Sequence, residues 1–469
     1  MDEKIKIFGK LIFDETASHN SAYRVINQIE NDSTYGTFLD FPDYWNDKWE
    51  INPNSIASNE GVNQIDDEIY SFELNINSRF FSVERGGLQH LVGILTGDLF
   101  HLRIPDVPDF NLRVDRFELP PSLREQAKDR FRNGCSHDIE SIRSLFQLSK
   151  KRPLLAFSFK PRVGVSTDAL REVTMGVLQA GFNVVELDTR NLHLSEKRID
   201  ELLSIAEDVS EMEFNHVARF SPNLSLPSNE ALRLCGQFID VQSSPYVVKV
   251  DGGMEGMGTL QELRKHLYDG SDDSTEDENR STQSHPITTT YPLLRKHLQG
   301  KIPSEQFVDL LSLSGADIIY PGGRPDLGGG ARSLGAKKKT QLVDSVERYQ
   351  RFTDQGWPMP TIAGGIHAGE LHAFYELVGP DVAYFLGGAV ALHRDGPVAG
   401  AELCSKVIDE AIRLRKEKSV GDEIPDLKNN LVKRVESSYG SGDDERFGYR
   451  SPQDLIDKVY SLDSYFDRL

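Results

Sequence analysis

Two pairs of adjacent glycines in the last quarter of the chain could bind a phosphate. Gly364-Gly365 and Gly387-Gly388 each follow a short apolar run, and a helix-like pattern separates the two runs. Glycine lets the backbone approach an anion closely, and the start of a following helix adds its dipole. The last two strand-loop units of a (β/α)8 barrel have this layout around a phosphate. A tight turn would explain one pair, but two pairs predict a sugar-phosphate-type enzyme rather than a binding module.

A second group of residues could bind a cation. Residues two apart on a strand share a face, so Glu186 and Asp188 can both point into a barrel mouth, and Lys249 and Asp251 repeat this spacing. One hypothesis is a Mg²⁺ site with carboxylate ligands from Glu186, Asp188 and Asp251. The other is a salt-bridge network without a metal, made by Glu186, Asp188, Lys160 and Lys249. The spacing leaves both open.

The elements that must position these residues follow a βαβ rhythm from Pro153 onward, which is typical of a parallel sheet. The expected strands are Leu154–Phe159, Asn183–Asp188, Glu213–Phe220, Tyr246–Asp251, Ile287–Thr290, Asp317–Tyr320, Pro360–Ala363 and Val382–Leu386. The expected helices include Thr167–Ala180, Glu196–Val209, Asn229–Phe238 and Ser304–Leu313. Eight such units favour a closed barrel, with a doubly wound open sheet as the alternative.

The first 145 residues do not show the regular alternation of strands and helices seen later in the chain, and their pattern indicates an α+β domain. Their strand-like runs are Ser21–Ile26, Glu68–Leu74 and Phe80–Val83, and their helix-like stretches include Gly86–Leu95 and Ser122–Phe131. The predicted domains are therefore 1–145, a barrel domain over 146–418, and a polar tail over 419–469. An acidic stretch near 268–284 predicts a disordered, solvated insertion in the barrel domain.

Composition limits the classes of function. A chain of 469 residues is too long for one ordinary domain, and 38% hydrophobic residues with 38 glycines fit a soluble α/β protein. A formal charge of −20 argues against nucleic acid or an anionic membrane as partner. We find no membrane-length apolar stretch, no signal peptide pattern and no paired cysteines, so a reducing, cytoplasmic location is expected.

One segment carries a family resemblance. Lys160-Pro161-Arg162-Val163-Gly164-Val165-Ser166 resembles the Lys-Pro-Lys-x-Gly-Leu-Ser segment of the RuBisCO large-subunit superfamily. Leu102-Arg-Ile-Pro, Leu313-Ser-Gly-Ala-Asp and the two glycine loops agree in the same order. The resemblance covers the chain from about Val92 to Ala411. It implies an N-terminal ferredoxin-like α+β domain, a C-terminal (β/α)8 TIM barrel, and a homodimer or multiple of dimers with each active site at the subunit boundary.

The departures from the family pattern imply that carboxylase activity is absent. Carboxylating members end the second barrel strand with Lys-Asp-Asp-Glu, whose carbamylated lysine binds magnesium together with the last two acids. Here Glu186 replaces that lysine and Thr189 replaces the final acid. The loop Pro321–Arg332 also has no counterpart of the mobile lid lysine. The chain thus resembles a divergent RuBisCO-like protein, in which Glu186 could bind Mg²⁺ without activation by carbon dioxide.

The resemblance also implies catalytic roles for Lys160, Arg162 and His285. Lys160 would protonate or deprotonate an enediolate, the alternative being a structural ion pair with Glu186. Arg162 would neutralise a developing oxyanion or an anionic substrate group. His285 would correspond to the family's active-site histidine, and Ser158 would help to position the substrate.

The glycine pairs would hold one end of the family's substrate. At the other end, Tyr320 and Ala363 replace the histidine and the serine of the family's second phosphate site. The simplest inference is a substrate with one phosphate or another single anionic end. Arg324 and Arg332 could replace the lost site, and a flexible loop without a ligand is the alternative.

The predicted function is proton chemistry on an enolisable, sugar-phosphate-like small molecule, as an isomerase, as an enolase, or as a lyase of decarboxylase or retro-aldol type. These reactions share an enediolate intermediate, so the residues do not choose among them. Two alternatives remain: a non-catalytic barrel that serves as a scaffold or ligand sensor, and different chemistry in a biosynthetic pathway.

Overall fold

The computed structural model describes residues 3–35, 57–80, 91, 104, 106–132, 137–160, 165–187, 195–251, 256–269, 287–290, 304–321, 349, 351, 354, 356–364, 366, 368, 371–391, 393 and 395–417. The chain forms two compact units. Unit 1 comprises residues 1–135, 252–264 and 292–315, and unit 2 comprises residues 136–251, 265–291 and 316–469.

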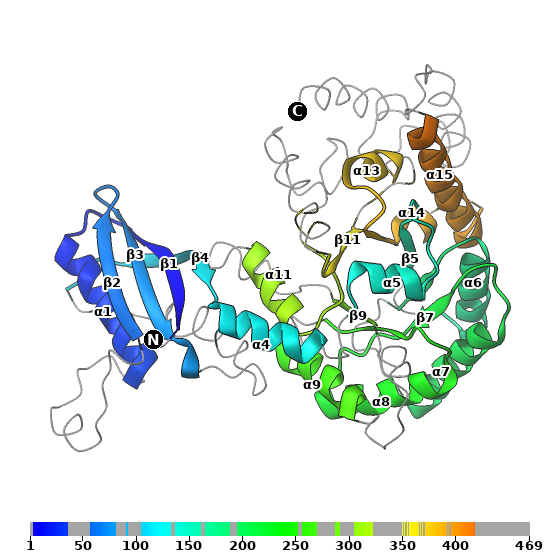
Figure 1. Ribbon diagram of the computed structural model, residues 1–469, viewed down its shortest axis with the longest axis horizontal. Coiled ribbons are helices and arrows are strands. Elements are labelled where there is room, and N and C mark those ends of the chain that lie inside the picture. Colours follow the sequence, from blue (N-terminus) through cyan, green and yellow to red (C-terminus); the bar gives the residue numbers. More distant parts are fainter. Residues whose placement is uncertain are drawn as a thin grey trace. The chain divides into compact units, whose positions relative to one another are not determined.

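Unit 1 contains a four-stranded antiparallel sheet in the order β2-β3-β1-β4, with helix α1 packed against it (Figure 1). The elements are β1 Lys4–Phe13, α1 His19–Tyr35, β2 Ala57–Gln64, β3 Ile69–Asn77, the short 3-10 helix η2 Ser78–Phe80 and β4 Phe110–Glu118. Helix α1 connects β1 to β2, and β3 lies between these two strands in the sheet. This is the split β-α-β arrangement of ferredoxin-like domains, as predicted.

One predicted strand in unit 1 is wrong. Ser21–Ile26 lies inside helix α1 rather than in a strand. Ala22, Val25, Ile26 and Ile29 are all fully buried, and their spacing places them on one face of a helix. The buried residues thus follow a helical period, which outweighs the strand preference of the β-branched Val25 and Ile26 at the end of the segment.

Of the other strand and helix predictions for residues 1–145, two match the structure and two lie mostly outside the described residues. Glu68–Leu74 falls within β3 except for its first residue, and Ser122–Phe131 falls within α4, Pro121–Arg132. Strands β1, β2 and β4 were not predicted. Phe80 belongs to η2, whereas 81–83 and, apart from Leu91, 86–95 lie outside the described residues. Unit 1 also contains α11, Ser304–Leu313, which contacts α4, and most of α9, Gly256–Asp269.

Unit 2 is a parallel barrel of eight strands in the order β7-β6-β5-β12-β11-β10-β9-β8. The strands are β5 Leu154–Ser158, β6 Val184–Glu186, β7 Arg219–Ser221, β8 Val247–Lys249, β9 Ile287–Thr290, β10 Ile318–Ile319, β11 Met359–Ala363 and β12 Ala383–Leu386. A bridge between Asn223 and Lys249 joins the two ends of the sheet. There the Lys249 N–H donates to Pro222 O at 2.9 Å, and the Leu224 N–H donates to Lys249 O at 2.8 Å. The predicted barrel is confirmed, and the open-sheet alternative is wrong.

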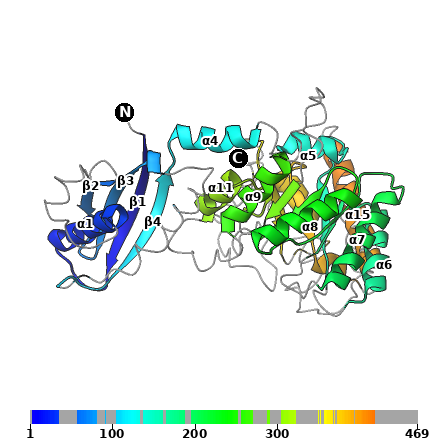
Figure 2. The same cartoon turned by 90° about the horizontal axis from the view of Figure 1, so that it is seen from below.

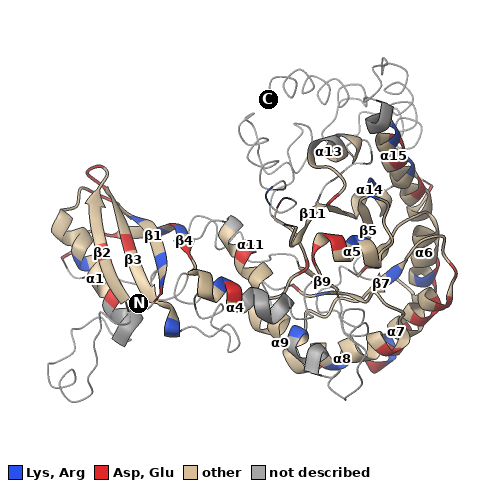
Figure 3. Cartoon of the chain, viewed as in Figure 1, with Lys and Arg blue, Asp and Glu red and all other residues tan. Residues whose placement is uncertain are grey.

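Helices alternate with the barrel strands along the chain, and α6, α7 and α8 lie outside the strands in Figure 1; Figure 2 shows the same helices from the side. Those of unit 2 are α5 Ile139–Leu145, α6 Thr167–Gln179, α7 Glu196–Glu211, α8 Ser228–Val241, α13 Leu371–Val378, α14 Gly388–Ala391 and α15 Pro397–Glu417. Figure 3 shows both signs of charge on α7 and α15. No helix in the described part of the chain is long and apolar enough to span a membrane. The predicted tail lies outside the described residues, as does the predicted insertion beyond its first two residues, which end α9.

The core of the barrel lies toward the amino ends of its strands. Apolar side chains of α5 and of the strands form one buried cluster there: Ile139, Ile142, Phe146, Leu154, Ala156, Val184, Val247, Ile287, Ile318, Met359, Ala383 and Phe385. Asp317, which precedes β10, is fully buried and accepts hydrogen bonds from the backbone N–H of His137 at 3.0 Å and of Thr288 at 2.8 Å. Helix α5 thus closes the amino end, which leaves the carboxyl ends of the strands for a site.

Candidate active site

A buried lysine–glutamate ion pair lies at the carboxyl ends of the barrel strands. Glu186 ends β6 and Lys249 ends β8, and these residues are only 2% and 6% exposed. Lys249 Nζ donates to Glu186 Oε1 at 2.7 Å, and Thr289 Oγ1 donates to Glu186 Oε2 at 2.8 Å. Both carboxylate oxygens are therefore engaged. Strand β7 lies between β6 and β8 in the barrel, and Ser221 of β7 is the register partner of Glu186. The ion pair therefore connects two strands that are not adjacent and passes over β7 near Ser221.

The ion pair borders a small cavity inside the barrel. The cavity has a volume of about 50 Å³, enough for a few water molecules. It is lined by Ser158, Glu186, Lys249, Thr289, Thr290, Ile318, Tyr320, Thr361, Ala363 and Phe385. Five of the lining residues carry a hydroxyl group and two form the ion pair, so polar side chains are available beside the cavity for a hydroxylated or carbonyl-containing molecule.

Lys160 lies beside the second glycine pair. The position that a Cβ on Gly387 would take lies 3.5 Å from Lys160 Cε and 3.5 Å from Ser158 O. Gly387 follows β12, and Gly388 begins α14. Gly364 follows β11 with a φ of +84°, a conformation that favours glycine over residues with a side chain. The structure therefore brings Ser158, Lys160 and Gly387 together at the barrel mouth.

The remaining predicted residues are placed as follows. Asp251 is fully buried two residues beyond Lys249, its backbone N–H donates to Ser225 Oγ at 2.9 Å, and it does not line the cavity. Tyr320 and Ala363, which replace the family's second phosphate site, both line the cavity. The predicted site residues that lie outside the described residues are Arg162, Asp188, His285, Arg324, Arg332 and Gly365.

The described residues do not fit a Mg²⁺ ion. A divalent cation on Glu186 would have to displace the Lys249 ammonium or lie beside it, and two cations repel strongly where little water screens them. Among the described residues, no three His, Cys, Asp or Glu side chains gather as metal ligands. Of the two hypotheses for these residues, the 2.7 Å contact between Glu186 and Lys249 matches the salt-bridge network.

Three threonines that complete this site were not among the predicted site residues. In β9 the three consecutive hydroxyls have three different partners: Thr288 donates to Asp317, Thr289 to Glu186 and Thr290 to Val250 O. A run of three threonines in a four-residue strand is the signal that could have identified them. Hydroxyl groups buried in a barrel need hydrogen-bond acceptors, which here are the carboxylates and a backbone carbonyl.

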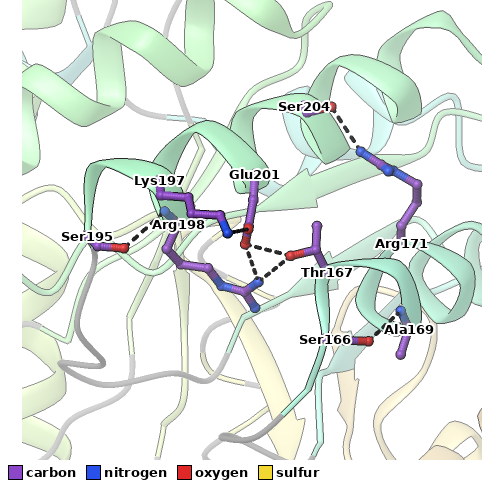
Figure 4. A network of polar contacts seen from close by, with 9 residues as sticks. All are labelled: Ser166, Thr167, Ala169, Arg171, Ser195, Lys197, Arg198, Glu201 and Ser204. Atoms are coloured by element: carbon purple, nitrogen blue, oxygen red, sulfur yellow. Dashed lines mark hydrogen bonds and ion pairs between the residues drawn. The ribbon is translucent and has the colours of Figure 1, made fainter.

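A polar network joins the starts of α6 and α7, the helices that follow the first two barrel strands (Figure 4). Thr167 Oγ1 donates to Glu201 Oε2 at 2.5 Å, and the Arg198 guanidinium donates to Thr167 Oγ1 at 3.0 Å and to Glu201 Oε2 at 2.9 Å. Ser166 and Ser195 cap the two helices. The network therefore fixes the helix starts that follow residues 161–164 and 188–194, which carry Arg162 and Asp188.

Thr167→Val should raise the pKa of Glu201 toward its ordinary value. The Thr167 hydrogen bond, and after it the Arg198 guanidinium, lower this pKa in the folded protein. A carboxylate with a lowered pKa adds stability above its ordinary pKa of about 4.3 and loses it as the pH falls through the folded value. The measurement is a carbon-13 NMR titration of glutamate carboxyls, with Glu201→Gln to assign the signal. Ser204→Ala removes a hydroxyl that bonds Arg171 and should leave the titration unchanged; an equal shift in both variants would contradict the assignment.

Comparisons with known proteins agree with this architecture. No model of a protein family matches the chain. The ribulose bisphosphate carboxylase of Methanocaldococcus jannaschii is 23% identical over 432 residues, which cover 87% of this chain and 93% of that protein. The dimeric archaeal RuBisCO of Hyperthermus butylicus has a TM-score of 0.68 at 18% identity, over 93% of this chain and 96% of that one. A RuBisCO-like protein from Burkholderia fungorum has a TM-score of 0.64 at 16% identity, over 93% and 100%. Over most of its length the chain is therefore similar in sequence and fold to RuBisCO large subunits and in fold to a RuBisCO-like protein, at low sequence identity.

Proposed function

We propose that this protein is a non-carboxylating enzyme that moves a proton on an enolisable, anionic carbonyl compound of the sugar-phosphate class, as an isomerase or lyase. The observation that carries the proposal is the buried Glu186–Lys249 pair. By resemblance, Glu186 occupies the position of the lysine that carboxylating members carbamylate, and a carboxylate cannot accept carbon dioxide in that way. Glu186 in turn holds the Lys249 ammonium at the site through a 2.7 Å contact, so the chain itself places a cationic group beside the cavity.

The proposed roles follow from the positions of the side chains. Lys160 lies at the barrel mouth and exchanges the proton on carbon. The Lys249 ammonium stabilises negative charge on the substrate oxygen, an interaction that strengthens as the enediolate forms. Ser158 and the cavity threonines hydrogen-bond to substrate hydroxyls, and the backbone at Gly364 and Gly387 binds the phosphate. No step in this scheme passes through a metal ion.

Resemblance to the family also supports a homodimer, or a multiple of dimers, as the working assembly. The Hyperthermus butylicus protein is described as dimeric. In this proposal the second partner is a small, phosphorylated substrate.

A second candidate function is ligand binding without catalysis. The observation in its favour is that Glu186 and Lys249 satisfy each other beside a cavity of only about 50 Å³. Such a barrel would bind a small anion and change nothing in it. The experiment below distinguishes this function from catalysis.

The test is proton exchange in deuterium oxide. We expect the protein to exchange the carbon-bound proton next to the carbonyl in at least one of dihydroxyacetone phosphate, ribulose 5-phosphate and ribulose 1,5-bisphosphate, observed by proton NMR. Exchange should persist in EDTA and need no bicarbonate. Lys160→Met should slow it about 10²–10⁴-fold, the usual contribution of a general acid–base. Lys151→Met, at the opposite end of β5, serves as the matched control and should exchange at the wild-type rate. Calorimetric binding of these compounds without exchange would favour the ligand-binding alternative.

A further inference from the structure

The position of Lys249 supports a more specific chemical role than charge stabilisation. Lys249 ends a barrel strand, is 6% exposed, and lines the cavity together with its carboxylate partner. Buried lysines of this kind can serve as amine nucleophiles toward carbonyl compounds. We propose that Lys249 forms an imine with the carbonyl carbon of the substrate, so that an enamine takes the place of the enediolate. This inference rests on the proposed function, because it requires a carbonyl substrate.

Glu186 is positioned to move the protons that imine formation requires. The hydrogen bond from Thr289 holds Oε2 at 2.8 Å, which directs Oε1 to the Lys249 nitrogen at 2.7 Å. An ammonium must lose a proton before it can attack a carbonyl, and the acceptor must lie within hydrogen-bond distance. Glu186 meets this requirement, and its own position does not depend on the substrate.

The reaction balances with the groups present. The Lys249 ammonium transfers one proton to Glu186, and the neutral amine forms a C–N bond to the carbonyl carbon. A proton moves from the nitrogen to the former carbonyl oxygen, giving a carbinolamine. Glu186 returns its proton to this hydroxyl, the C–O bond breaks, and water leaves. The products are an iminium cation and the Glu186 carboxylate, so the site keeps the same charge pair that it has at rest.

The iminium group acts as the electrophile in this reaction, so the scheme needs no metal ion for that purpose. Its positive charge acidifies the neighbouring C–H bond, and transfer of that proton to the neutral amine of Lys160 gives the enamine. Glu186 has a cationic partner both at rest and in the iminium, and it is itself protonated in between, so these stages avoid the cost of leaving a buried carboxylate without a partner. Lys160 is less suited to imine formation, because it is only partly buried, beside Gly387 at the barrel mouth.

Reductive trapping tests the proposal directly. Full-length protein is incubated with dihydroxyacetone phosphate and sodium cyanoborohydride, digested, and mapped by tandem mass spectrometry. We expect a reduced adduct on the peptide that contains Lys249, and loss of that adduct in Lys249→Arg, which keeps the charge opposite Glu186. Lys160→Arg should retain it. Within the wild-type map, Lys197 is the internal control, because its side chain is 87% exposed.

A chemically activated Lys249 should carry more adduct than Lys197, although it is far less accessible. Adduct on exposed lysines alone, or on Lys160 in place of Lys249, would overturn the proposal. This comparison uses only the wild-type protein, so it stands even if Lys249→Arg fails to fold. Deuterium exchange without a Lys249 adduct would refute the imine and leave the proposed function intact. An adduct without exchange would support the imine and refute the proposed proton transfer.

Discussion

Lys249→Met is expected to destabilise the folded protein by about 3–5 kcal/mol, because it leaves Glu186 buried without its cation. The hydrogen bond from Thr289 would remain, but one hydrogen bond does not compensate for the lost charge partner. Adding Glu186→Gln should recover most of the loss, since a neutral amide needs no cation and can still accept from Thr289. Urea unfolding of the single and double variants, followed by circular dichroism, measures the coupling between the two positions.

An exposed ion pair in the same unit provides the control for Lys249→Met. Lys406 and Glu402 lie one helical turn apart on α15 at 3.2 Å, with side chains that are 60% and 52% exposed. Lys406→Met should change the stability by less than about 0.5 kcal/mol, because solvent screens such pairs. Equal effects of the two lysine variants would show that the Glu186–Lys249 pair is not buried in the folded protein.

Asp317→Ala is expected to be as damaging, with a loss of at least about 3 kcal/mol, because it removes a buried acceptor from several donors at once. The carboxylate accepts from the His137 N–H, from the Thr288 N–H and, at 3.2 Å, from the Thr288 hydroxyl. These bonds join the segment before α5 to β9 and β10 at the closed end of the barrel. Asp317→Asn should recover only part of the loss, since an amide nitrogen would face a donor.

Asp138→Ala is the matched control for the Asp317 variants. Asp138 caps α5 by accepting from the Ser141 N–H at 2.7 Å, and it is solvent-exposed. Loss of such a cap costs about 1 kcal/mol. Thermal melting of both alanine variants under identical conditions compares the two carboxylates. If Asp317→Ala melts no lower than Asp138→Ala, the buried hydrogen bonds do not hold the closed end of the barrel together.

The architecture of the barrel could be predicted from the sequence because it depends on local patterns, namely short strand-like runs that alternate with helix-like stretches. Each of the eight predicted strands overlaps an observed one, and most are apolar because buried parallel strands need apolar side chains on both faces, but Glu213–Phe220 contributes only its last two residues to β7. Ser21–Ile26 shows the limit of such reading. Its composition suits a strand, and only the spacing of Val25, Ile26 and Ile29 across a longer window reveals the helix.

The chemical character of the site depended on tertiary structure. The strand spacing placed Glu186 and Lys249 at the barrel mouth, and it was compatible with a metal site and with an ion pair. Which one forms depends on whether β6 and β8 come close enough for their side chains to meet. That distance is set by closure of the barrel through the Asn223–Lys249 bridge, not by any local pattern. Thr289 lies 103 positions from Glu186 in the chain, and only the folded barrel makes it the second partner of that carboxylate.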